Sequence, residues 1–102
     1  METKLATWQE LKQWLNLEFD DNKDSIEVMA CGIEGYLSIG TGLILDTLKD
    51  DSVIAYVLAR DYLQTKLHSK YYRVADENVE KHLQTIIEQL KILALTVVQS
   101  AE

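Results

Sequence analysis

Apolar residues recur every three or four positions along most of the chain, which is the spacing of amphipathic helices. The first such stretch begins at Thr7. Thr7 and Glu10 form a T-x-x-E capping box, in which the Thr7 hydroxyl accepts the N–H of Glu10 and the Glu10 carboxylate accepts the N–H of Thr7. The pattern predicts a short helix over 7–15, with an apolar stripe of Trp8, Leu11, Trp14 and Leu15.

A second helix is predicted from about Ser25 to the Gly40-Thr41-Gly42 turn, where glycine tolerates the left-handed cap conformation. Acidic residues within 21–24 are expected to cap its first turn. Gly32 and Gly35 interrupt its polar side, and they indicate either close approach of a neighbouring helix or a bend. The apolar stripe consists of Ile26, Met29, Ala30, Ile33 and Leu37.

The third helix is expected to begin after a cap formed by Asp50, Asp51 and Ser52, and to end near Leu67. Its first half, residues 53–59, has almost no polar face, which is typical of a helix buried on all sides. We therefore expect it to be the central element. The segment before it, from Leu43 to Leu48, fits either a short helix or a packed turn.

Residues 68–76 are predicted to form an extended loop, followed by a last helix that Asp76 caps. Its stripe consists of Val79, Leu83, Ile86, Ile87, Leu90, Ala94 and Val97. The apolar run from Ile92 to Val98 is wider than this stripe, so it is either buried under the bundle or exposed as a patch for another copy.

The composition agrees with a helical chain. Its 102 residues suit one domain, 47% of them are apolar, and there is no proline, which breaks helix interiors. We expect an all-α fold over residues 1–102: a small bundle of four to five helices with a central buried helix and ordered loops. Leu17 and Phe19 are expected to hold the loop after the first helix against the core.

The chain carries a net charge of −7, all of it in the first half. Residues 1–51 hold eleven acidic and four basic side chains, whereas residues 52–102 hold six of each. Free-standing DNA-binding proteins normally carry a basic surface, so this class is disfavoured. One basic stretch, Arg60, Lys66, Lys70 and Arg73, is opposed only by Asp61. The charge asymmetry suggests contact between acidic and basic faces of different copies, although a solvated surface also explains it.

The sequence offers little for catalysis or metal binding. Asp20-x-Asn22-x-Asp24 imitates the start of a calcium loop, but Ser25 and Cys31 stand where such a loop needs glycine and glutamate. His68 and His82 lack the spacing of a zinc site. Cys31, the only cysteine, is expected to be a packed, inert thiol. We therefore expect no cofactor, no metal and no enzymatic activity.

The basic stretch continues into an aromatic cluster, Lys70-Tyr71-Tyr72-Arg73. Aromatic and arginine side chains stack on nucleic-acid bases, and they are also enriched at protein interfaces. In a chain of charge −7 the interface is favoured. The residues expected at an interface between subunits, or with a partner, are Asp20, Asp21, Asp24, Lys66, Lys70, Tyr71, Tyr72 and Arg73.

The order of these elements resembles the head–tail connector (adaptor) proteins of tailed phages. The resemblance covers residues 5–92. It lies in Leu11-Lys12-Gln13-Trp14-Leu15, in the acidic segment with Asp20, Asp21 and Asp24, and in the following helix that ends at Thr41-Gly42. Ala59-Arg60-Asp61-Tyr62 matches the end of the family's buried helix, and the last helix matches through Ile87 and Leu90.

The resemblance implies a structural phage or prophage protein that works in virion assembly and DNA packaging. Copies would form a ring, of about twelve, beneath the portal protein of the DNA-filled head. The ring would extend the DNA channel and receive a tail-completion or stopper protein, with DNA only as passing cargo and no membrane partner. The protein would stay in the host cytoplasm during assembly and then at the head–tail junction.

A different class of function also fits. A small acidic regulatory protein of a mobile element could bind one host protein as a monomer or dimer, without forming a ring. The start of the chain shows no secretory signal, and its apolar runs are shorter than a membrane span. Either function is expected in a soluble, intracellular protein.

Overall fold

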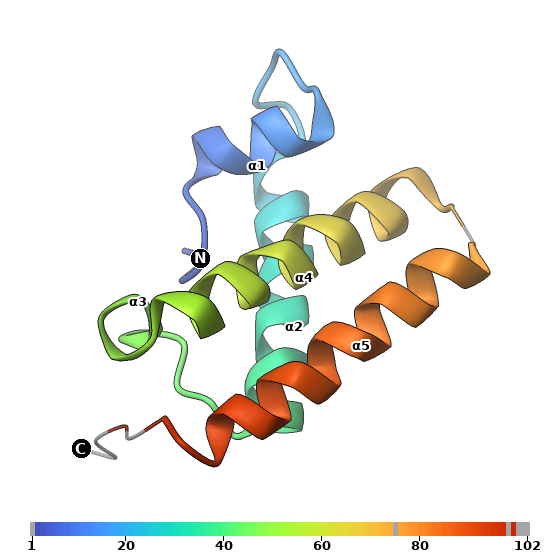
Figure 1. The fold of residues 1–102 in the computed structure, drawn as a ribbon. Coiled ribbons are helices and arrows are strands. Elements are labelled where there is room, and N and C mark those ends of the chain that lie inside the picture. The colour runs from blue at the N-terminus through green and yellow to red at the C-terminus, as the bar shows by residue number, and fades with distance from the viewer. Residues whose placement is uncertain (1, 75, 98, 100–102) are drawn as a thin grey trace.

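The computed structural model describes residues 2–74, 76–97 and 99. Regular structure in these ranges is entirely helical (Figure 1). The elements are α1 (Trp8–Leu15), α2 (Lys23–Thr41), α3 (Leu48–Asp51), α4 (Val53–Tyr72) and α5 (Glu77–Ala94). The predicted all-α bundle of four to five helices is confirmed.

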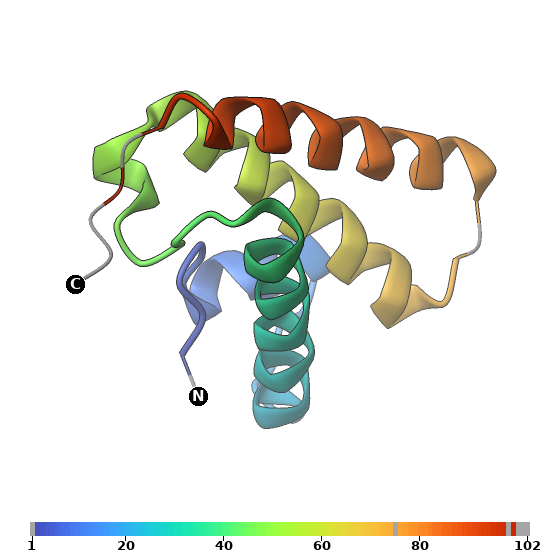
Figure 2. The ribbon, with the colours of Figure 1, turned by 90° about the horizontal axis from the view of Figure 1, so that it is seen from below.

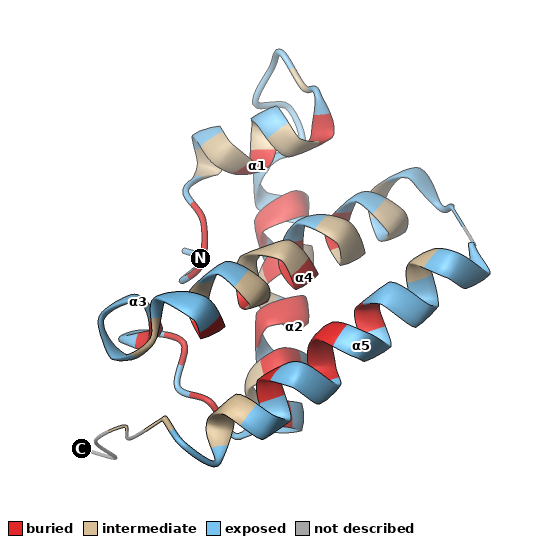
Figure 3. Cartoon of the chain, in the orientation of Figure 1, coloured by how far each residue is buried: buried red, intermediate tan, exposed pale blue. Residues whose placement is uncertain are grey.

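Helix α4 is the central element, because α1, α2, α3 and α5 all pack against it. Helix α5 lies alongside α4, and α2 crosses behind both at a steep angle (Figures 1 and 2). The ten most completely buried large side chains come from all five helices and from the segment that precedes α1 (Figure 3). They are Leu5, Leu11, Leu15, Ile26, Leu37, Leu48, Leu63, Leu67, Ile86 and Leu90.

The helix ends follow the predicted signals in most cases. Both bonds of the Thr7–Glu10 capping box are present at α1. Helix α2 ends at Gly42, whose φ of 77° is left-handed. Ser52 accepts the N–H of Ala55 at α4, and Asp76 accepts the N–H of Asn78 at α5. These caps satisfy backbone groups that have no partner inside the helix.

The start of α2 differs from the prediction. Asn22, not an acidic residue, occupies the N-cap, and its side chain makes no capping hydrogen bond with the described residues. Asp20 is engaged with α1 instead, as described below. The prediction of capping by acidic side chains is therefore wrong, although Asp24 still lies in the first turn, where the helix dipole favours a negative charge.

The glycines inside α2 do not mark a crossing helix. No described atom outside the helix's own backbone would lie within 4 Å of a Cβ built on Gly32 or Gly35. Both residues are exposed. The buried stripe faces the opposite way, so the expected close approach of a neighbouring helix at these positions is wrong.

Helix α4 is longer than predicted, and the expected loop over 68–76 is wrong for its first five residues. The helix continues through Tyr72 and ends at Arg73, whose φ of 54° is left-handed. Side-chain contacts support the extra turn: the His68 and Tyr72 rings lie 4.7 Å apart, and the Tyr72 hydroxyl donates to the carbonyl oxygen of Leu15. The His68–Tyr72 pair is local, four residues apart in α4, but the Leu15 carbonyl belongs to α1, so local sequence does not reveal that contact.

The remaining ambiguities are also resolved. Residues 43–47 form a packed connection with Leu43 and Leu45 buried, and the short helix α3 follows from Leu48. Helix α5 ends at Ala94, and Val98 lies outside the described residues.

Candidate interaction surfaces

The acidic loop between α1 and α2 is tied to α1 through Asp20. Its carboxylate accepts the Trp8 indole N–H at 2.8 Å and pairs with the Lys12 ammonium at 2.8 Å. The hydrogen bond from Lys12, followed by that from Trp8, lowers the pKa of Asp20. Leu17 packs against the core as predicted, but Phe19 is 70% exposed, so the expectation that it holds the loop down is wrong.

The other acidic residues of the predicted interface, Asp21 and Asp24, are exposed next to Phe19 and in the first turn of α2. The loop therefore presents an aromatic ring flanked by carboxylates to solvent. Asp20 is its internal anchor, and this role was not expected from the sequence.

The predicted basic and aromatic residues lie at the end of α4 and point to different surroundings. Tyr71 packs partly against the core, and the Tyr72 hydroxyl reaches α1. Arg73 forms the C-cap of the helix. Lys66 and Lys70 line a groove that the other three residues do not line. The five residues therefore do not form one loop site, because the helix turns them to different faces.

The groove lined by Lys66 and Lys70 lies between α2, α4 and α5 and has a volume of about 530 Å³. Ile33 and Leu83 give it apolar walls, and Tyr62, which is 4% exposed, lies in it with Tyr36. Burial raises the pKa of Tyr62.

The rim of the groove is open on one side and charged on another. Exposed Gly32 leaves the α2 side open, and the Glu80 carboxylate is 3.8 Å from the Lys66 ammonium. The groove thus combines an apolar and aromatic interior with two ammonium groups.

A second surface consists of apolar side chains on the outer side of α4 and α5. Val53, Ile54 and Val57 are exposed, Ile54 to 67%, and Ile92 of α5 is exposed to 65%. Together with Leu58 and Leu93 they line an open groove of about 610 Å³, which we call the apolar face.

The composition of residues 53–59 predicted a helix buried on all sides. This prediction is wrong, because Val53, Ile54 and Val57 are exposed. Residues such as Ala55 and Ala59 face the core while the branched residues of the same turns face outward. The apolar run that begins at Ile92 divides between the two alternatives. Ile92 and Leu95 are exposed, whereas Leu93, Ala94 and Val97 pack partly against the core.

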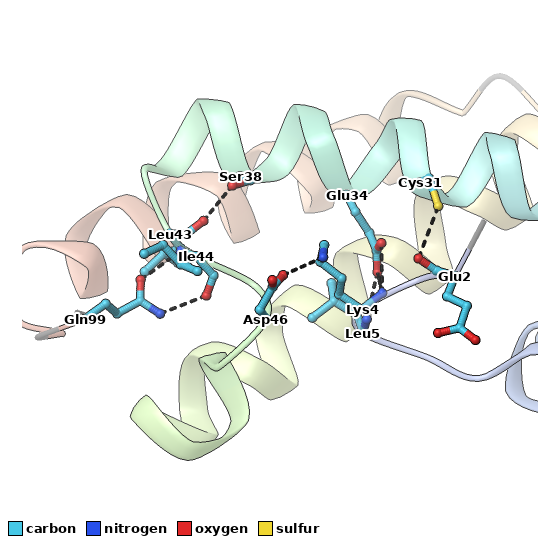
Figure 4. Close-up of polar contacts among 10 residues, drawn as sticks. All are labelled: Glu2, Lys4, Leu5, Cys31, Glu34, Ser38, Leu43, Ile44, Asp46 and Gln99. Carbon is cyan, nitrogen blue, oxygen red and sulfur yellow. Dashed lines mark hydrogen bonds and ion pairs between the residues drawn. The ribbon is translucent and has the colours of Figure 1, made fainter. Parts of the chain in front are cut away.

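A buried carboxylate holds the N-terminal segment on α2 (Figure 4). Glu34, 4% exposed, accepts hydrogen bonds from the N–H groups of Lys4 and Leu5 at 2.7–3.0 Å. The Lys4 ammonium pairs with Asp46 at 2.7 Å. Burial raises the pKa of Glu34 despite the backbone donors. This contact is structural, because it places Leu5 in the core.

Glu34 was not recognised from the sequence, although a signal was present. It follows Ala30 by four positions and precedes Leu37 by three, so it lies on the buried stripe of α2. A charged residue on such a stripe indicates a buried, hydrogen-bonded group.

The histidines and the cysteine lie in separate places. The His82 ring is 3.2 Å from the Asp61 carboxylate, and the His68 ring packs against the Tyr72 ring at a tilt of 49°. The Cys31 thiol contacts the Glu2 carbonyl at 3.6 Å, and burial raises its pKa, which disfavours the reactive thiolate. Among the described residues, no three histidine, cysteine or acidic side chains come together as ligands for a metal ion.

Comparison of the chain with protein-family models, with curated proteins and with solved structures finds no match. Within the described part of the chain, none of the helices has the length and apolar character that crossing a membrane requires.

Proposed function

We propose that this protein is a non-catalytic structural subunit of a phage or prophage particle, which connects the portal of the DNA-filled head to the tail. The apolar face carries the proposal. Four branched side chains, Val53, Ile54, Val57 and Ile92, are exposed on neighbouring turns of α4 and α5. Contiguous apolar surface of this kind is typical of protein contacts. The order of elements that resembles head–tail connectors supports this type of assembly.

The charge distribution suits a subunit that surrounds passing DNA. The acidic half of the chain, with exposed carboxylates such as that of Asp24, would repel phosphate and let the duplex slide without being retained. The ring would present its other surfaces to the portal protein above and to a tail-completion or stopper protein below.

The test is electron microscopy of particles produced when the gene carries an early stop codon. The expected result is DNA-filled heads lying apart from finished tails, since the connector alone is missing. Supplying the protein in trans should restore complete particles. Normal infectious particles from the mutant would contradict the proposal.

The acidic half also favours a second candidate, a regulatory protein of a mobile element that binds a host protein. It would act as a monomer or dimer in the host cytoplasm and be absent from particles. Immunodetection in purified virions separates the two functions: a virion subunit is found at a fixed number of copies per particle, whereas a regulator is not found there.

A further inference from the structure

We infer that neighbouring copies of this chain join head to tail, with Phe19 of one copy inserted into the groove between α2, α4 and α5 of the next. Because a ring needs one repeated contact between copies, this contact depends on the proposed function. It names the partner of the acidic loop as a second copy of the same chain.

The projecting half of the contact is Phe19. Its side chain is 70% exposed, so the ring is accessible to a partner. The backbone around it is held in place, since Asp20 is bonded to Trp8 and Lys12 and the Lys23 N–H donates to the Asp20 carbonyl at 3.1 Å. The ring is therefore presented on a fixed loop, which lowers the entropy cost of docking.

The receiving half is the groove. Ile33, Leu83 and Tyr62, all nearly buried, form an apolar floor, and the 66% exposed Tyr36 offers an aromatic face to an inserted phenylalanine ring. The volume of about 530 Å³ leaves room for such a ring. Apart from its chain neighbours and the nearby backbone of α2, Gly32 has no described atom within 4 Å of the place of its missing Cβ, so the α2 wall remains open there.

The charges of the two halves are complementary. Phe19 is flanked by the exposed carboxylates of Glu18 and Asp21. Lys66 and Lys70 lie one helical turn apart in the groove, where Glu80 pairs with Lys66 at 3.8 Å and Lys70 is exposed. The lining therefore keeps an excess of one positive charge, and a carboxylate beside an inserted ring would meet the Lys70 ammonium, which favours this partner over one with a basic surface.

Phe19 cannot reach the groove of its own molecule. Gly32 lies nine residues after Lys23, the first residue of α2, which is about 14 Å along the helix axis from the loop. No residue of the loop lines the groove. A contact between different surfaces of identical copies is heterologous, and it leads to a ring when the rotation closes.

The experiment compares sedimentation of the full chain with two variants, each defective in one half. The wild type should associate at concentrations up to about 1 mM, and less so at high salt. Phe19→Ala and Gly32→Leu should each be monomeric. Mixed together, they should give one-to-one dimers and nothing larger, because only one intact contact remains.

The matched controls are an exposed apolar residue and an open glycine that do not belong to the proposed contact. Ile39→Ala removes another exposed apolar side chain of α2, and Gly40→Leu fills another open glycine position of the same helix; neither residue lines the groove. Both should associate like the wild type. Circular dichroism of every variant verifies the fold.

Three results would overturn the contact. These are a wild-type chain that stays monomeric at about 1 mM, association that survives both substitutions, or a mixture that does not dimerise. Association lost on Ile54→Gln but retained in Phe19→Ala would instead assign self-contact to the apolar face. Heads and tails still separated by the stop codon would then leave the proposed function standing without this contact.

Discussion

At the scale of single residues, Glu34 shows how one buried carboxylate fixes a chain terminus. Its two oxygens accept the N–H groups of Lys4 and Leu5, and Leu5 is fully buried. Glu34→Ala would leave these donors without acceptors, and a buried unsatisfied group costs about 1–3 kcal/mol. We expect the free energy of unfolding to fall by about 2–3 kcal/mol in urea titrations. Glu88→Ala, on the exposed side of α5, should change it by less than about 0.5 kcal/mol; equal effects would contradict the assignment.

Two glutamates should respond to acid with opposite signs. The pKa of Glu10 is lowered, first by the backbone hydrogen bond from Thr7, so its contribution to stability is present at neutral pH and is lost as the pH falls through the folded-state pKa. Burial raises the pKa of Glu34, so the folded state takes up that proton first and gains stability as the pH falls.

The corresponding measurement is urea unfolding at pH values between about 7 and 3. Glu10→Gln should flatten the loss of stability in acid. Glu34→Gln should steepen it, because the compensating protonation is removed. If the free energy of unfolding of both variants changed with pH in the same way as that of the wild type, these carboxylates would not set the response to acid.

At the scale of elements, one glycine inside α2 and the glycine that caps it have opposite roles. Gly35 is helical and open to solvent, so Gly35→Ala should stabilise the protein by about 0.5–1 kcal/mol through helix propensity. Gly42 has a φ of 77°, so Gly42→Ala should cost about 1 kcal/mol or more. Thermal unfolding of the pair checks both signs; a destabilising Gly35→Ala would indicate a partner for that side of α2.

Helix α4 has apolar residues on both its buried and its exposed sides. Ile54→Gln and Val57→Gln should each change the free energy of unfolding by about 0.5 kcal/mol or less at low protein concentration, because both side chains are exposed. Leu63→Ala, which empties a buried position of the same helix, should cost about 2–5 kcal/mol. Binding of a dye specific for apolar surface should fall in the two glutamine variants. Large losses of stability there would mean that the outer side of α4 is packed.

At the scale of the whole molecule, the uneven charge predicts weak contact with DNA. With a net charge of −7 and its exposed carboxylates, the protein should give no anisotropy change with a labelled duplex below about 10⁻⁴ M at physiological salt. A variant with Glu18, Asp21 and Asp24 all changed to lysine should bind, with a steep salt dependence. Tight binding by the wild type would exclude a DNA channel that lets its cargo slide.

Short-range patterns in the sequence specify the ends of most helices. The Thr7–Glu10 box, the Ser52 and Asp76 caps and the glycine turn at 42 act through residues within one turn of each other, so a pattern of letters specifies them. Helical spacing of apolar residues also predicted most of the buried stripe of α5.

Contacts between segments that are distant in the sequence set which apolar surfaces are covered and which polar groups have partners. The extension of α4 through Tyr72 depends partly on Leu15 of α1, and the burial of Glu34 depends on a segment some thirty residues earlier in the chain. Ile54 and Ala55 are both apolar, yet one faces solvent and the other the core, because the neighbouring helices cover only one side of α4. Sequence periodicity gives the direction of a side chain around its helix, but contacts between distant segments determine what it meets.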